Sequence, residues 1–540
     1  MNGVRPTGSR RPSQTGTGAW LAVVLVAGLT AVPVLVVLAS LWQPQPDIWE
    51  HLRRHLLPEL LVNSVWLLAG VGAGVTLVGV SLAWLTARCE FPGRGFFFWA
   101  LLLPLAVPAY VTAFVWLGLV DISSPLAGWL RGLGLHPPPI RSRGGVILVM
   151  TLALYPYVYL TAHAAFRSQG PRLLEAARSL GLSRWQAFWR VSLPMARPGI
   201  LAGLGLALME TLADFGTVAV FNYDVFTTAI YKAWFALFSL TAASQLASLL
   251  ILAAFAALLL ERMTRGNWTP ADEGAGSGTR LRLSGASAWL ALTACGSVWL
   301  LAFLVPVVQI LAWALASAGR DLDARYLGFA WHSLLLSGLG ALLVTLLALV
   351  LAYAQRWHPR PGLRVLARFA AMGYAVPGAV LAVGIVVALS WLDARLKALT
   401  GLDGPLLTGT LTVVLAAYAA RFLAVGLGPV EAGLGRVTPG MDEAAQSLGV
   451  LGWERLRRVH LPILRPSLLA ALALTFVDLM KELPITLMTR PFGWDTLAVR
   501  VFEMTSEGEW ERAALPAILI TLAGLLPVAY LIRRMDHAGT

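Results

Sequence analysis

A polar segment occurs twice in this sequence, once in each half. Residues 171–198 read PRLLEAARSLGLSRWQAFWRVSLPMARP, and residues 439–466 read PGMDEAAQSLGVLGWERLRRVHLPILRP. Matching positions are separated by a constant 268 residues, as between Glu175 and Glu443. A repeat at about half the length of a 540-residue chain indicates two copies of one structural unit. We therefore expect two similar halves.

Each copy is expected to form two short helices joined by a glycine elbow. A proline opens the first helix, where its missing N–H costs nothing, and a glutamate in the first turns suits the helix dipole. Gly181 and Gly449 are predicted to cap these helices in the left-handed conformation. Ser183 and Gln186 predict a capping box for the next helix of the first copy.

A Leu-Pro pair closes the pattern in both copies, as Leu193-Pro194 and Leu461-Pro462. Because proline disfavours helical geometry in the residue before it, we expect the second short helix to end there. An amphipathic loop lying on a membrane surface is the plain structural alternative for such a segment.

The rest of the chain is apolar. Hydrophobic residues make up 58% of it and charged residues only 13%, which indicates many membrane spans. The net charge of +13 comes mainly from arginines in loops, and no aromatic-basic motif points to nucleic acid. The two cysteines, Cys89 and Cys295, exclude a disulfide framework.

Twelve apolar runs predict the fold class: an all-α polytopic membrane protein with 12 transmembrane helices, arranged as two parallel six-helix repeats. A glycine-rich polar stretch separates the sixth run from the seventh. We expect a first domain at 1–261, a cytoplasmic linker at 262–286 and a second domain at 287–540. The runs lie near 20–42, 62–86, 97–120, 145–166, 199–221, 235–261, 287–314, 332–354, 367–392, 406–428, 467–488 and 513–532.

The placement of arginine gives the orientation. With the N-terminus inside, most basic residues fall in inside segments, as the positive-inside rule requires. This topology puts both termini, the linker and both copies of the repeated polar segment in the cytoplasm.

The repeated pattern of Glu-Ala-Ala, a glycine six residues on and a later Leu-Pro resembles the cytoplasmic signature loop of bacterial ABC-importer permeases. The resemblance implies two permease domains fused in one inner-membrane chain. It also implies that each loop is a coupling helix seated on a homodimeric ATP-binding subunit, which carries ATP and Mg, so this chain needs no cofactor of its own. A periplasmic binding protein would deliver the substrate. The coupling positions carried over are Glu175, Ala176, Ala177, Gly181, Leu193, Pro194, Glu443, Ala444, Ala445, Gly449, Leu461 and Pro462.

Charged residues occur inside the span that follows each loop. Glu210 and Asp214 align with Asp478 and Glu482 at the same offset, and Lys481 lies between the latter two. Within each half the two carboxylates are four residues apart, so we expect them to share one helical face. Five such groups facing lipid would cost on the order of 12 kcal/mol, so they must face protein or water. They could line a cation pathway, or form an ion-pair network that holds the halves together.

The same stretches, residues 210–235 and 481–503, resemble the fused permeases of ferric-iron importers. Carboxylates and Tyr223 could supply the oxygen ligands that Fe(III) prefers, although no dense ligand cluster indicates tight coordination, so the metal ligands stay unassigned. Fused thiamine, polyamine and phosphonate permeases carry similar loops, so these substrates stay open.

Two other classes of protein are weaker fits. An ion-coupled secondary transporter would leave the twin loops without a purpose. The absence of the dipeptide Gly-Lys excludes a Walker A loop, and the scattered histidines give no catalytic arrangement, so we do not expect an enzyme.

Overall fold

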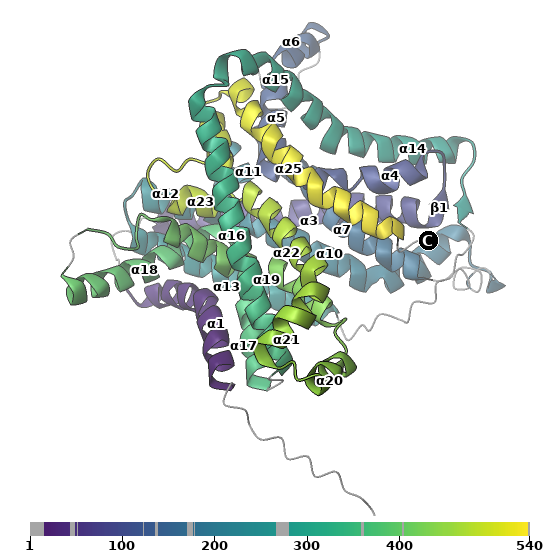
Figure 1. The fold of residues 1–540 in the computed structure, drawn as a ribbon. Helices are drawn as coiled ribbons and strands as arrows, with labels where there is room; N and C mark the ends of the chain where they lie inside the picture. Colours follow the sequence, from purple (N-terminus) through teal and green to yellow (C-terminus); the bar gives the residue numbers. More distant parts are fainter. Residues whose placement is uncertain are drawn as a thin grey trace, which may run out of the picture.

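The computed structural model describes residues 16–43, 49–50, 52–121, 124–134, 139–169, 177, 179–265, 280–357, 361–401 and 404–537, and is helical almost throughout (Figure 1). The first half contains α1 (Gly16–Ala39), η1 (Ser40–Trp42), η2 (Leu52–Leu56), α3 (Leu57–Arg88), β1 (Cys89–Glu90), α4 (Arg94–Ala100), η3 (Leu103–Ala106), α5 (Ala109–Val120), α6 (Pro125–Gly132), α7 (Arg143–Ser168), α9 (Arg184–Ala187), η4 (Phe188–Ser192), α10 (Leu193–Ala213), α11 (Gly216–Val220), α12 (Phe226–Phe235) and α13 (Leu240–Arg265).

The second half repeats the main helices of the first. It contains β2 (Leu281–Arg282), α14 (Ala286–Trp299), η5 (Leu300–Leu304), α15 (Val305–Asp321), α16 (Ala324–Trp357), α17 (Pro361–Ala371), η6 (Met372–Ala375), α18 (Gly378–Thr400), α19 (Leu411–Leu434), α20 (Pro439–Ser447), α21 (Gly452–Arg455), η7 (Leu456–His460), α22 (Leu461–Lys481), α23 (Pro484–Thr489), α24 (Leu497–Ser506) and α25 (Trp510–His537). Thus α3, α7, α10 and α11 correspond to α16, α19, α22 and α23.

The two halves exchange their first helices. Helix α1 packs on α17 and α18 of the second half, and the Thr30 hydroxyl donates a hydrogen bond to the carbonyl of Ala370 (3.1 Å). In the same way α14 packs on α4 of the first half, where the rings of Phe96 and Trp299 lie 5.2 Å apart (Figure 1). Each half therefore covers part of the other, which fixes the interface between them.

A short parallel strand pairing adds to the helical fold. Strands β1 and β2 pair Cys89 with Leu281 and Glu90 with Arg282. This pairing joins the end of the predicted linker to the first half, since Arg280 also lies 3.3 Å from the carboxylate of Glu90. The all-α prediction therefore missed one small element, because two-residue strands leave no periodic signal in the sequence.

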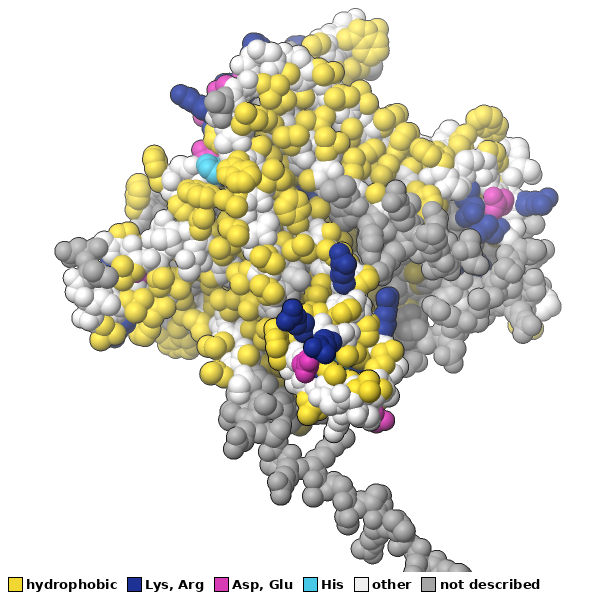
Figure 2. Space-filling model, in the orientation of Figure 1, with side chains coloured by type: hydrophobic (Ala, Val, Ile, Leu, Met, Phe, Trp, Pro, Cys, Tyr) yellow, Lys and Arg dark blue, Asp and Glu magenta, His cyan; other side chains and the backbone are white. Residues whose placement is uncertain are grey.

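Ten helices of the described chain are long and apolar enough to cross a membrane, or eleven if the bent pair α4–η3 and α5 counts as one span. The predicted count of twelve is therefore not shown. Its last run falls on α25, a 28-residue helix that is not among these candidates. The surface over these helices is largely apolar (Figure 2), as lipid contact requires.

The predicted continuous run at 97–120 is wrong, because the chain bends by 92° between η3 and α5. Proline explains the break: Pro108 is extended, with φ −58° and ψ 142°, and its ring forces the preceding residue out of helical geometry. Pro377 divides the run at 367–392 in the same conformation, with φ −55° and ψ 141°. Both breaks deliver loop residues to the interface between the halves.

Candidate functional site

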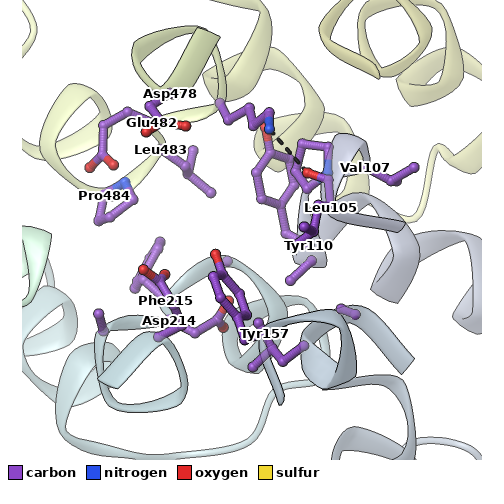
Figure 3. A pocket seen from close by; sticks show the side chains of 18 of the residues that line it. Leu105, Val107, Tyr110, Tyr157, Asp214, Phe215, Asp478, Glu482, Leu483 and Pro484 are labelled. Atoms are coloured by element: carbon purple, nitrogen blue, oxygen red, sulfur yellow. Dashed lines mark hydrogen bonds between the residues drawn. The ribbon is translucent and has the colours of Figure 1, made fainter. Parts of the chain in front are cut away.

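A cavity of about 190 Å³ lies between the two halves. The first half contributes residues from η3, α5, α7, the end of α10 and the start of α11, and the second half contributes residues from η6, α19, α22 and α23. Figure 3 shows Asp478 and Glu482 on one side of this space and Asp214, Phe215 and Tyr157 on the other. The wall is therefore built from helices that correspond between the two halves and from the irregular segments next to them.

All five intramembrane charged residues predicted from the sequence line this one cavity. They are Glu210, Asp214, Asp478, Lys481 and Glu482. The expectation that they face protein or a hollow rather than lipid is confirmed. An ionised group at the centre of a span costs about 2.5–3.5 kcal/mol on insertion scales, so this enclosure is what allows them to be there.

The prediction that each carboxylate pair shares one helical face is wrong. Helix α10 ends at Ala213 and α22 ends at Lys481, so Asp214 and Glu482 lie beyond the helices that carry Glu210 and Asp478. In the second half the break has a plain cause, since Pro484 has no N–H for the helical ladder and its ring clashes with the preceding turn.

Asp214 and Glu482 instead hold the start of the next short helix. Asp214 accepts hydrogen bonds from the Thr217 hydroxyl (2.9 Å) and the Val218 backbone N–H (3.2 Å) at the N-terminus of α11. Glu482 accepts one from the Ile485 N–H (3.0 Å) at the N-terminus of α23. Acceptors at this position satisfy N–H groups that no helical carbonyl can reach.

Glu210 and Asp478 are not bonded to the start of any described helix. Glu210 accepts one hydrogen bond, from the hydroxyl of Tyr374 (3.2 Å). Within the described residues no donor lies at hydrogen-bond distance from the Asp478 carboxylate. These two carboxylates bond to no backbone N–H group of the described chain, whereas Asp214 and Glu482 each accept from the backbone at the start of a short helix.

Lys481 bridges the halves. Its ammonium donates a hydrogen bond to the carbonyl of Leu105 in η3 (3.1 Å), drawn as a dashed line in Figure 3. The corresponding position 268 residues earlier is Ala213, so this tether has no counterpart in the first half.

The sequence reasoning missed four lining residues: Tyr110, Tyr157, Tyr374 and Arg421. Arg421, on α19, is 7% exposed and lies 3.8 Å from a carboxylate oxygen of Glu482. An arginine inside an apolar helix carries the same signal that singled out Lys481, so the argument from insertion cost would have found it. The tyrosines had no such signal, because aromatic residues are common in apolar spans.

The glycine elbows of the two repeated loops have the predicted geometry. Gly181 and Gly449 adopt φ 86° and 78°, the left-handed region that favours glycine. The following N–H groups of Leu182 and Val450 bond back to the carbonyls of Ala177 (3.1 Å) and Ala445 (2.9 Å), the pattern of a Schellman cap. The capping box is also confirmed. The Gln186 backbone N–H donates a hydrogen bond to the Ser183 hydroxyl, and the Ser183 backbone N–H donates one to the side-chain oxygen of Gln186.

The Leu-Pro pairs do not end a helix. Leu193 and Leu461 instead begin α10 and α22, directly after the π-helical turns η4 and η7. A proline in the first turn of a helix needs no N–H partner, and the wider turn before it takes up the interrupted ladder. The Leu-Pro pairs therefore mark a helix boundary, as predicted, but they begin a helix instead of ending one.

The predicted coupling residues are only partly described. Glu175 and Ala176 lie outside the described residues, while Ala177 and Ala445 are buried and Glu443 and Ala444 are exposed on the loop. Large apolar side chains stand out beside them: Leu180 is 82% exposed, Trp185 69%, Leu448 81% and Trp453 72%. Exposed apolar groups at matching places on two polar loops are typical of a protein-docking surface.

The second loop is clamped by charge. Asp442 on α20 receives Arg356 Nη2 at 2.6 Å and His460 Nε2 at 2.9 Å, and Arg455 Nη1 lies 3.9 Å away. Burial alone would raise the pKa of the Asp442 carboxyl, but hydrogen bonds from Arg356 and His460 outweigh it and hold that pKa below its ordinary value. The carboxylate therefore stays ionised and ties α20 to the end of α16.

The first loop cannot form this clamp, because positions 174 and 192 are Leu174 and Ser192 in place of the aspartate and histidine. Arg88, which matches Arg356, donates instead to the carbonyl of Gln169 (2.7 Å). The described parts of the two loops share the glycine elbow, but the ionic clamp at Asp442 belongs to the second loop.

Comparisons with known proteins agree with this architecture. The family described as "Binding-protein-dependent transport system inner membrane component" matches residues 76–263 and 344–538, once in each half. The Fe(3+)-transport system permease protein FbpB 2 of Haemophilus influenzae is 30% identical over 490 residues, covering 89% of this chain and 90% of the relative. The putative ferric transport system permease protein FbpB 1 of that organism is 25% identical over 493 residues, covering 85% of this chain and 75% of the relative.

A shorter relative matches less of the chain. The putative 2-aminoethylphosphonate transport system permease protein PhnV of Salmonella typhimurium is 36% identical over 205 residues, covering 37% of this chain and 73% of the relative.

The family matches and the full-length relatives together show that this chain belongs to the binding-protein-dependent transport system inner membrane components. It is the non-catalytic, multi-pass inner-membrane permease of an ABC importer, with two permease domains.

Proposed function

We propose that this permease moves Fe(III), delivered by a periplasmic binding protein, into the cytoplasm, driven by ATP hydrolysis on a separate subunit. The observation that carries the proposal is the cavity at the interface of the halves, where four carboxylates from both halves meet. A cation crossing between the halves would find negative charge from each of them on its way.

The chemistry of the lining suits a hard cation. Fe(III) prefers oxygen ligands, and the cavity offers carboxylates together with the phenol oxygens of Tyr157 and Tyr374. Among the described residues no three His, Cys, Asp or Glu side chains are grouped closely enough to hold a metal ion. Contacts spread over several residues allow the ion to bind and to leave again, which suits passage.

Within this site we assign the carboxylates different roles. Glu210 and Asp478 contact the passing ion, because neither carboxylate is bonded to backbone N–H groups at the start of a described helix. Asp214 and Glu482 act mainly by holding the ends of α11 and α23 in place, and Lys481 acts by tethering α22 to η3.

The relatives support iron over the alternatives. The ferric permeases match across both halves, whereas the phosphonate permease matches 37% of the chain. The names of these relatives describe those proteins, so the substrate of this chain rests on the cavity and on the experiment below.

The twin loops are the proposed coupling elements. We place them in the cytoplasm with both termini and the linker, each loop seated on one subunit of a homodimeric ATPase. The exposed Leu180, Trp185, Leu448 and Trp453 side chains support this docking. The positive-inside arrangement of arginines supports the orientation.

Neutralising the free carboxylates tests the proposed pathway. Glu210→Gln and Asp478→Asn each remove one negative charge at nearly constant volume. We expect radiolabelled iron uptake to fall about tenfold or more while membrane abundance is kept, because an ionic contact is worth about 1.5–3 kcal/mol.

Asp214→Asn is the matched control for these variants. Its amide oxygen can still accept from the Val218 N–H, and its amide N–H can donate to the Thr217 hydroxyl, so uptake is expected to survive. If all three variants lose abundance together, the carboxylates are a structural network around Lys481 and Arg421, since breaking a buried ion pair destabilises the fold.

Iron is expected to be the substrate whose uptake depends on this chain. In cells that lack other iron importers, uptake of radiolabelled Fe(III), thiamine, spermidine and 2-aminoethylphosphonate is compared with and without the chain. Dependence of iron uptake alone supports the assignment. Dependence of another substrate, with iron unaffected, rejects iron and leaves the permease family standing.

The glycine elbows should be essential for coupling. Proline fixes φ at about −65° and cannot replace Gly449 at φ 78°, so Gly449→Pro should cut uptake about tenfold or more and release the ATPase in co-purification. Gly435→Ala, at φ −61° and with only ordinary contacts for a Cβ, should leave both unchanged. Full uptake and full ATPase binding in Gly449→Pro, also when combined with Gly181→Pro, would refute the docking role.

A further inference from the structure

The cavity holds a positively charged side chain that the cation pathway does not explain. Arg421 is 7% exposed and lines the cavity, and its Nε and Nη1 find no hydrogen-bond acceptor among the described residues. Its ion-pair contact to Glu482, at 3.8 Å, is longer than a hydrogen bond, and that carboxylate oxygen already accepts from Ile485. Buried guanidinium N–H groups are normally satisfied, so these donors point to a missing acceptor.

The charges around the cavity lead to the same conclusion. At their formal charges the lining residues comprise four carboxylates and two cations, which leaves two negative charges. A trivalent metal ion alone would convert this into one positive charge. Excess charge is costly in an enclosed site of low dielectric, and one singly charged oxyanion entering with Fe(III) would bring the sum to zero.

The free donors are confined to one side of the cavity. Both cations come from the second half, and the matching first-half positions are Ala153 and Ala213. The Lys481 ammonium donates one of its three N–H groups to the Leu105 carbonyl, whereas Nε and Nη1 of Arg421 on α19 donate to no described residue. The metal would lie near Glu210 and Asp478, and the anion beside α19.

We propose that the cavity takes Fe(III) together with an oxyanion, which accepts hydrogen bonds from Nε and Nη1 of Arg421. The planar guanidinium suits phosphate and carboxylate oxygens, which accept from it in a fixed geometry. The oxyanion enters only with the metal, because the cavity without it is net negative and repels an anion. This inference rests on the proposed iron function and names the form in which iron passes.

Double-label retention tests the pairing. The permease is purified with its ATP-binding subunit in nanodiscs and incubated with radiolabelled Fe(III) and either labelled inorganic phosphate or, in separate samples, labelled citrate. We expect about one oxyanion to be retained per iron, and the oxyanion to be lost when iron is omitted. The two arms distinguish an inorganic from an organic oxyanion.

Arg421→Gln should reduce oxyanion retention about tenfold or more relative to iron, since charge-assisted hydrogen bonds are lost. Arg500→Gln is the matched control, because Arg500 pairs with Glu503 (2.8 Å) outside the cavity. It should retain both labels.

Three outcomes would overturn the inference. Iron retained by the unaltered protein without either oxyanion refutes the pairing while the iron function stands, and this result needs no variant to fold. Oxyanion retained without iron refutes the linked entry. No iron retained at all refutes both the pairing and the proposed iron site.

Discussion

An ionised carboxylate cannot face lipid, and the centre of this structure follows from that constraint. The repeat places Glu210 and Asp478 on corresponding helices, and each needs an enclosed polar space that one half alone does not provide. The exchanged helices α1 and α14 hold the halves against one another, and the proline breaks before α5 and α18 bring irregular backbone to their interface. Such backbone is tolerated within a membrane where it lines a protein-enclosed cavity. The cavity is thus a product of the interface rather than of either domain.

The carboxylates of the cavity occur at corresponding positions in both halves, whereas its cations occur only in the second half. Glu210 and Asp214 have counterparts in Asp478 and Glu482. The first-half positions that correspond to Arg421 and Lys481 are alanines. The loops show the same division, with a shared glycine elbow and an ionic clamp at Asp442 in the second copy only. A fused chain can let its halves diverge in this way. The second half consequently carries both cations of the cavity, together with the loop that holds the Asp442 clamp.

Features of the structure that depend on neighbouring residues, or that occur in both halves, could be predicted from the sequence. Gly181 and Gly449 were predictable because glycine alone adopts φ near 80° without strain, and the Ser183–Gln186 capping box depends on neighbours three residues apart. The cavity carboxylates were found because charge inside an apolar run is costly wherever it falls. Spacing alone failed for Asp214 and Glu482, since i, i+4 geometry holds only if the helix continues, and here it stops one residue earlier. Arg421 lies on α19 and Glu482 just beyond the end of α22, and periodicity in the sequence does not show which helices pack together.

The central claim is that the cavity between the halves lies on the transport path, and thiol modification of its wall tests this most directly. Ala213 lines the cavity without a charge of its own. In a chain with Cys89 and Cys295 changed to serine, Ala213→Cys is treated with a small cationic thiol reagent, beside Leu399→Cys at the end of α18, where Leu399 is 83% exposed. We expect modification at position 213 to stop iron uptake and iron-loaded binding protein to slow the reaction, with neither effect at position 399. Complete modification of Ala213→Cys with unchanged iron uptake would contradict the account.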